Sequence, residues 1–341
     1  MDVLSPRESA KFIAARSKHV EVVYDEIQSA SEVILKRMTE AKYSMKTWKS
    51  HKMHPKAMDD DALQWIFVVD CLNFSFWVYK DKEPYAVEYN GEVYNDYEAL
   101  CAVVNRALEE DVPITTPEYY KSLTVEDARR MFRSANETEL PLIERRVAHL
   151  REAGEILSKH FDNSVGNLIS TCNKSAVTLV RKIVSMFSSF RDEAFYNGKH
   201  VSFYKRAQIF VADVWACFEG EKYGHFNDIT ELTMFADYRV PQCLQFLGIL
   251  RYSADLQQKI EKEEEVQAGS EEEVELRGCS IHAVECLLNT MNKNGNINGG
   301  INFGKSNLNS IIIDYYLWDY ATMNSDKMMK FPEHRTRTHF Y

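Results

Sequence analysis

Asp237 is the residue of this sequence with the clearest potential for chemistry. It lies in the octet FADYRVPQ (235–242), which is followed by an apolar stretch through Leu244, Leu247 and Leu250. An aspartate at the start of a helix is favoured by capping and by the helix dipole, which is the simpler explanation of the octet. The alternative is a carboxylate that the helix N-terminus holds ionised in a cleft. There it would stabilise an oxocarbenium-like centre or attack it.

A second acidic segment, IDYYLWDY (313–320), has four aromatic residues beside two aspartates. In a helix, Asp314 and Trp318 share one face, and Asp319 lies about 140° round from Asp314. One interpretation is a pocket wall whose aromatic residues, Tyr315 and Trp318 among them, stack a ring and whose acids bind donors. The other, equally favoured, is an amphipathic core helix with exposed acids.

A third segment, DCLNFSFW (70–77), places Asp70 and Asn73 inside an otherwise apolar run that includes Phe74. Buried polar side chains cost free energy unless they are hydrogen-bonded. Their partners are either backbone groups of the protein or, in the sharper hypothesis, a bound base.

Cationic and metal-ligating residues give weaker signals. Lys205, Arg206 and Arg239 are candidate phosphate contacts, although two adjacent cations on a helix are usually exposed. His51 and His54 are spaced i, i+3, but a metal site needs further ligands and no other His or Cys pair has ligand spacing. We expect no metal and no cofactor, and no dinucleotide-binding, P-loop, nucleophile-elbow or zinc-protease motif occurs.

The bulk properties describe an ordinary globular protein. The chain has 341 residues, 45% hydrophobic and 27% charged, with a formal net charge of -10. That charge argues against a nucleic-acid polymer as partner, since proteins that bind such polymers carry basic surfaces, whereas one mononucleotide phosphate needs few cations.

Seven cysteines without a CxxC pair indicate buried, reduced thiols. No signal peptide and no run of about 18 apolar residues is present, so we expect a soluble, cytoplasmic protein without membrane contact. The oligomeric state is not readable.

Helical periodicity dominates the chain, so the predicted fold is mainly α. A small β element is expected near residues 65–95, from the aromatic and β-branched run 65–79 and a hairpin around Asn90-Gly91 with a type I′ turn. Two segments, 261–275 and 290–308, are predicted to be exposed loops within one domain spanning 1–341. The predicted helices are 20–40, 125–133 (opened by a Thr124–Asp127 capping box), 139–158, 165–187 and 203–219.

Six segments together resemble the queuosine salvage protein family, the queuosine 5′-phosphate N-glycosylases. They are VVDCLNFSFW, FYKRAQIFVADVW, FADYRVPQ, VELRGCSIHAVE, IDYYLWDYA and HRTRTHFY. The resemblance implies a helical fold like that of the helix–hairpin–helix DNA glycosylases. In that fold a catalytic aspartate precedes a helix, as Asp237 here precedes Arg239 and then Leu247-Gly248.

The resemblance also implies hydrolysis of queuosine 5′-phosphate, a small-molecule nucleotide, to queuine and ribose 5-phosphate, so that queuine is salvaged into tRNA. A 7-deaza base cannot be protonated at position 7, so Asp237 is expected to act on the sugar cation, covalently or by charge alone. Asp314, Asp319, Phe235 and Trp318 would bind the base, together with His51 and Asn73. A queuine carrier without turnover is the main alternative, and a DNA glycosylase is a third that the acidic charge disfavours.

Overall fold

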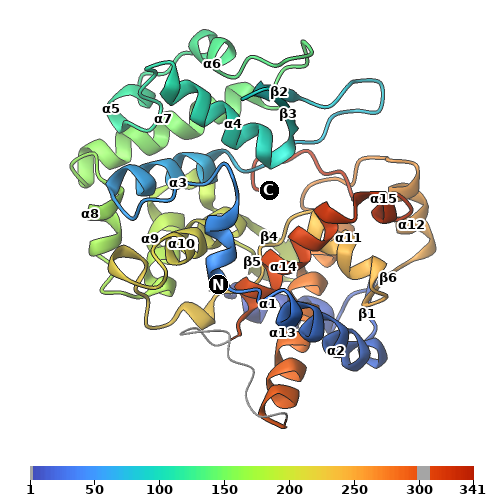
Figure 1. Ribbon diagram of the computed structural model, residues 1–341. Helices are drawn as coiled ribbons and strands as arrows, with labels where there is room; N and C mark the ends of the chain where they lie inside the picture. The colour runs from blue at the N-terminus through green and yellow to red at the C-terminus, as the bar shows by residue number, and fades with distance from the viewer. Residues whose placement is uncertain (1–2, 298–307) are drawn as a thin grey trace. The chain divides into compact units, whose positions relative to one another are not determined.

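The computed structural model describes residues 3–297 and 308–341, with the backbone alone for 294–297. Helices make up most of these residues, and the strands form three two-stranded antiparallel sheets, β1–β6, β2–β3 and β4–β5 (Figure 1). The mainly α prediction is therefore confirmed. The chain groups into two compact units. Unit 1 comprises Met1–Thr47, Asp192–Lys205 and Thr230–Arg337, and unit 2 comprises Trp48–Arg191, Arg206–Ile229 and Thr338–Tyr341. The single domain over 1–341, like its DNA-glycosylase-like fold, stays a prediction.

Unit 1 is organised around one long helix, α13. The helix packs against α1, α2 and α14 (Figure 1). It approaches α1 closely at Gly278. A Cβ at this position would lie 2.6 Å from Cδ1 of Ile13, so the small residue permits the contact. The elements are α1 (Pro6–Ala14), β1 (Val20–Val22), α2 (Tyr24–Glu40), β4 (Glu193–Tyr196), β5 (Lys199–Ser202), α11 (Arg239–Phe246), β6 (Leu250–Tyr252), α12 (Ala254–Glu261), α13 (Glu271–Ile297), α14 (Ser310–Met323) and α15 (Ser325–Met328).

Unit 2 packs its helices mainly on α3 and α7. Its hairpin has the predicted type I′ turn, because Asn90 and Gly91 both have positive φ angles, 52° and 78°. The elements are α3 (Asp60–Leu72), β2 (Ala86–Tyr89), β3 (Glu92–Asn95), α4 (Asp96–Glu109), α5 (Pro117–Tyr120), α6 (Val125–Met131), α7 (Ile143–His160), α8 (Val165–Ser170), α9 (Ala176–Met186), η2 (Ser188–Phe190), α10 (Lys205–Cys217, its first residue counted with unit 1) and η3 (Lys222–Gly224). Two further 3-10 turns, η1 (Met45–Ser50) and η4 (Ile229–Glu231), fall at the unit boundaries.

The predicted β element at 65–79 is wrong, because this run begins inside helix α3. Asp59 caps the helix by accepting a hydrogen bond from the Ala62 amide at 2.9 Å. Nearly every residue of the helix after its first turn is buried. A helix that is buried on all sides has no polar face, so its sequence lacks the periodicity that distinguishes helix from strand.

Two predicted helices have different bounds in the structure. The helix expected over 165–187 is divided into α8 and α9, because Asn173 and Lys174 have left-handed φ angles of 50° and 60°. The helix expected over 20–40 loses its first residues to strand β1, which pairs with β6. The helices expected over 125–133, 139–158 and 203–219 are confirmed as α6, α7 and α10. Thr124 caps α6, since its Oγ1 accepts from the Asp127 amide at 3.0 Å.

The loop predicted over 261–275 is wrong in its second half, because α13 begins at Glu271. Glu273 and Glu275 are buried, although a run of glutamates normally indicates a solvated face. Glu275 accepts hydrogen bonds from the Lys18, His19 and Val20 amides, so its charge is satisfied by a distant segment. In the predicted loop 290–308, residues 290–297 are helical and 298–307 lie outside the described residues.

Six of the seven cysteine side chains are buried and all seven are free thiols, as the sequence predicted. No helix in the described part of the chain is long and apolar enough to cross a bilayer.

Candidate active site

The first half of the octet around Asp237 forms a tight loop, and residues 239–242 are the first turn of helix α11 of unit 1. Oδ1 of Asp237 accepts hydrogen bonds from the Arg239 and Val240 amides, each at 3.0 Å. The Asp237 amide itself donates to the Phe235 carbonyl oxygen at 2.7 Å. The N-cap position of α11 is Tyr238, and the carboxylate of the residue before it accepts the first two amides of the helix, where the helix dipole favours negative charge.

The surroundings of Asp237 act on its ionisation in opposite directions. Burial raises the pKa of the Asp237 carboxyl above its ordinary value, whereas the Lys205 charge, the two α11 amides and the Arg239 charge lower it. The residue as a whole nevertheless keeps part of its surface accessible to solvent. A partly desolvated carboxylate interacts more strongly with a neighbouring cation than a fully hydrated one does, because less water screens it.

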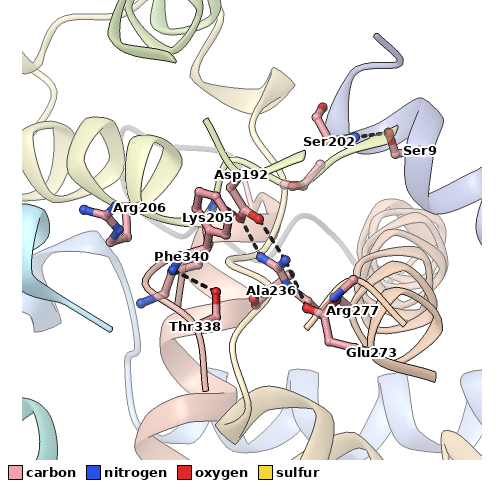
Figure 2. Close-up of polar contacts among 12 residues, drawn as sticks. Ser9, Asp192, Ser202, Lys205, Arg206, Ala236, Glu273, Arg277, Thr338 and Phe340 are labelled. Carbon is pink, nitrogen blue, oxygen red and sulfur yellow. Dashed lines mark hydrogen bonds and ion pairs between the residues drawn. The ribbon is translucent and has the colours of Figure 1, made fainter. Parts of the chain in front are cut away.

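Two side chains from distant segments hold the loop that carries Asp237. Oδ1 of Asp314 accepts the Phe235 amide at 2.9 Å. Nε of Arg277 donates to the Ala236 carbonyl oxygen at 3.0 Å (Figure 2). The Phe235 ring is buried, with its centroid 5.9 Å from that of Tyr315. The loop is therefore fixed at each of the two residues that precede the carboxylate.

Two of the predicted phosphate contacts belong to the same unit as Asp237. Lys205 is 4% exposed, and its amide donates to Oδ2 of Asp192 at 3.1 Å. The Arg239 side chain forms an ion pair with Glu333. The expectation that adjacent helical cations are exposed is wrong for Lys205 and for Arg206, which is 1% exposed.

Helix α14 carries the second predicted set, and its helical structure is confirmed. Asp314 is buried, whereas Tyr315, Trp318 and Asp319 keep part of their surface accessible. Oδ2 of Asp319 accepts the Tyr43 hydroxyl at 2.5 Å, and burial together with this carboxylate raises the pKa of Tyr43. Tyr43 is therefore a neutral donor beside an acid.

The remaining predicted residues, His51, Asn73 and Phe74, belong to unit 2. Nε2 of His51 lies 3.3 Å from Oε1 of Glu98. Asn73 is 5% exposed and follows the last residue of α3. The fully buried Phe74 ring has the guanidinium carbon of Arg146 4.2 Å from its centroid. These positions stay predictions as substrate contacts.

Comparison with known proteins identifies the family. A family model described as queuosine salvage protein matches residues 53–341. The chain belongs to the queuosine salvage protein family.

Relatives named queuosine 5′-phosphate N-glycosylase/hydrolase match almost end to end. The protein of Nematostella vectensis is 45% identical over 344 residues, which is 99% of each chain. The protein of Bos taurus is 43% identical over 99% of each chain. That of the bacterium Sphaerobacter thermophilus is 37% identical over 100% of this chain and 98% of its own.

In this member of the queuosine salvage family, sequence reasoning missed three residues that support the loop and α14. Arg277 lies in one of the segments that carry the resemblance, but an arginine inside an acidic helix gave no further signal. Asp192 and Tyr43 lie in no quoted segment, and their partners, Arg277 and Asp319, are 85 and 276 residues away. No three His, Cys, Asp or Glu side chains among the described residues converge as metal ligands.

Proposed function

We propose that this chain hydrolyses the N-glycosidic bond of queuosine 5′-phosphate, releasing queuine and ribose 5-phosphate for queuine salvage. The full-length relatives that bear this name support the reaction. The observation that carries the assignment of the site is the Asp237 carboxylate, which is partly accessible, partly desolvated and fixed at the start of α11.

Asp237 acts on the sugar as the bond to the base breaks. The bonding electron pair leaves with the base nitrogen, and positive charge develops on C1′ and the ring oxygen. Both α11 amides donate to Oδ1, so Oδ2 is the oxygen that faces this charge. A fixed carboxylate stabilises the transition state more than the neutral substrate. Water then adds to C1′ and loses one proton, and the departing base takes up one proton.

The base has carbon at position 7, which closes the protonation route available to purines. Recognition of the leaving base therefore contributes more to the reaction. Tyr315, Trp318 and Asp319 are the accessible aromatic and acidic side chains of α14, and they are suited to stack on the ring and accept its donors. Phe235 and Asp314 support the loop that carries Asp237. The Phe235 ring packs against Tyr315, and Asp314 accepts the Phe235 amide.

Lys205 and Arg239 are the cations that we assign to the 5′-phosphate. Both act electrostatically on Asp237, so a phosphate that they bind is held close to the carboxylate. A single phosphate requires few cations, and the net charge of -10 favours a mononucleotide over a polymer.

The test is incubation of the purified chain with queuosine 5′-phosphate and chromatography for free queuine. We expect release by the wild type and loss in Asp237→Asn. Asp255→Asn is the matched control, because Asp255 is an exposed aspartate in the first turn of α12. Intact-mass measurement of the quenched reaction separates covalent attack, which leaves a ribose-phosphate adduct, from charge stabilisation.

Three outcomes would change the assignment. Tight binding of queuine without release from any nucleoside or nucleotide would indicate a carrier. Undiminished release by Asp237→Asn would remove the residue from the mechanism. Retained binding to a DNA duplex at physiological salt would revive a polymer substrate.

A further inference from the structure

A buried ionic cluster in unit 1 is centred on Arg277 of α13. Nη1 and Nη2 of Arg277 bind the two oxygens of Asp192 at 2.8 and 2.5 Å, and Nη1 also lies 3.3 Å from Oε1 of Glu273 (Figure 2). Arg277, Asp192 and Glu273 are each at most 3% exposed. The guanidinium carbon lies 4.1 Å from the centroid of the Phe203 ring.

The cluster is joined to the loop of the candidate site. The third guanidinium nitrogen, Nε, donates to the carbonyl oxygen of Ala236, the residue before Asp237. Oδ2 of Asp192, which accepts from Arg277, also accepts the amide of Lys205. Arg277 thus connects the backbone that carries the Asp237 carboxylate, directly at Ala236, with the backbone of Lys205, by way of Asp192.

The cluster is also anchored to the rest of the unit. The Gly269 amide donates to Oε2 of Glu273 at 3.0 Å, which ties the acid to the turn before α13. Gly278, next to Arg277, is in close contact with Ile13 of α1. The Arg277 side chain therefore extends from a helix whose position is set by packing.

Stability alone is a weak explanation for such a cluster. Desolvation of buried ions offsets most of their attraction, and apolar replacements are often neutral or stabilising. The planar guanidinium of arginine, in contrast, holds several acceptors in fixed positions relative to one another, which the ammonium group of lysine cannot do. We propose that Arg277 is a positioning residue that sets the placement of Asp237 relative to Lys205. This inference rests on the proposed function.

The test compares Arg277→Lys with the wild type in queuine release from queuosine 5′-phosphate. A misplacement of the order of 1 Å costs about 10²-fold in rate, so we expect kcat to fall about 10²-fold per folded molecule with KM changed little. The acid limb of the pH profile should move to higher pH, because a more distant Lys205 lowers the pKa of Asp237 less. Arg106→Lys is the control: Arg106 also donates to main-chain carbonyl oxygens, in unit 2, and should leave the limb in place.

A double variant separates positioning from general stability. If Arg277 acts through Asp237, the variant Arg277→Lys/Asp237→Asn should be no slower than Asp237→Asn alone, because residues that act as a unit are non-additive. The proposal would be overturned if the two substitutions reduced kcat multiplicatively in the double variant, or if Arg277→Lys alone left kcat and the acid limb unchanged. Neither result would affect the role of Asp237. Equal rates for the wild type and Asp237→Asn would instead remove the proposed function.

Asp192→Asn provides a second variant if Arg277→Lys does not fold. It keeps one oxygen, which can accept both the Lys205 amide and one Arg277 nitrogen as Oδ2 of Asp192 does, but its NH2 group replaces the second acceptor and breaks the charged fork. We expect the same direction of change with a smaller loss of kcat, together with the displaced acid limb. A normal acid limb in this variant would count against the proposal.

Discussion

The start of α11 and the end of α3 are both contacted by charged side chains, and the charges have opposite signs. At α11, amide groups point out of the helix, and the Asp237 carboxylate accepts two of them. At α3, carbonyl groups point out, and the guanidinium groups of Arg146 and Arg206 donate to the Leu72 and Cys71 oxygens. Each sign follows from the groups that a helix leaves without partners at that end.

The two regions differ in access to solvent. Arg146 and Arg206 are 0% and 1% exposed, and Arg146 also donates to the Phe74 and Ser75 carbonyl oxygens. Asp237 keeps part of its surface accessible, although its surroundings raise its pKa. Arg146 and Arg206 donate to main-chain oxygens and are almost fully buried, so they organise their own chain. The accessible and partly desolvated Asp237 carboxylate can meet a substrate. Interaction with a helix end explains the position of the arginines and of Asp237. Only the access of Asp237 to solvent distinguishes it as the candidate for catalysis.

Asp237→Asn should have the largest effect on the reaction and little effect on stability. We expect kcat to fall by roughly 10²–10³-fold, as for removal of one fixed charge-stabilising group. Asn is also a good capping residue, so the helix start is retained.

The pH dependence of stability sharpens this prediction. Burial raises the pKa of Asp237 in the folded state above its ordinary value of 3.8, so its ionisation destabilises the fold as pH rises through the raised pKa. The midpoint temperature of Asp237→Asn should therefore equal or exceed that of the wild type at neutral pH, and the difference should shrink as pH falls. A clear loss of stability at neutral pH would indicate a structural cap.

Arg146→Ala should have the opposite signature. It leaves several buried carbonyl oxygens without their donor, and each unsatisfied group costs about 1–3 kcal/mol. We expect the free energy of unfolding, measured by urea denaturation, to fall by about 3 kcal/mol or more. Arg145→Ala is the matched control, since Arg145 is the exposed neighbour on the same helix and should change stability by less than about 0.5 kcal/mol. Equal effects of the two variants would contradict the structural role.

Arg239→Ala should affect substrate choice more than turnover. A charge-assisted hydrogen bond to phosphate is worth roughly tenfold in binding, so KM for queuosine 5′-phosphate should rise about tenfold while KM for queuosine stays nearly constant. Glu333→Gln serves as the comparison, because it weakens the ion pair that holds Arg239 and should lower KM for the phosphate or leave it unchanged. A parallel rise for both substrates would exclude Arg239 as the phosphate contact.

Lys205→Met should raise KM for queuosine 5′-phosphate by less than Arg239→Ala does, because an ammonium group binds phosphate as a point charge and not as a fork, and it should displace the pH profile. The Lys205 charge lowers the pKa of Asp237, so its removal raises that pKa, and activity that needs the ionised carboxylate begins at higher pH. The measurement is kcat/KM against pH, with Lys262→Met at the exposed end of α12 as control. An acid limb that does not move would show that Lys205 does not act on Asp237.

Much of the local structure was predictable because it depends on neighbours in the sequence. The hairpin turn at Asn90-Gly91, the Thr124 cap and the helix start at Asp237 all follow from hydrogen bonds or φ angles within about four residues. The helix over 65–72 was not predictable in the same way, because complete burial removed its polar face.

The sequence by itself thus determined which residues begin and end elements, and which acids and aromatics are grouped along the chain. Only the tertiary structure decided which charges are sealed and which are accessible. Glu275 is buried against the amides of residues 18–20, and Arg277 finds Asp192 at a separation of 85 residues. The physical reason is that burial and charge pairing depend on contacts between distant segments, and local periodicity carries no information about those partners.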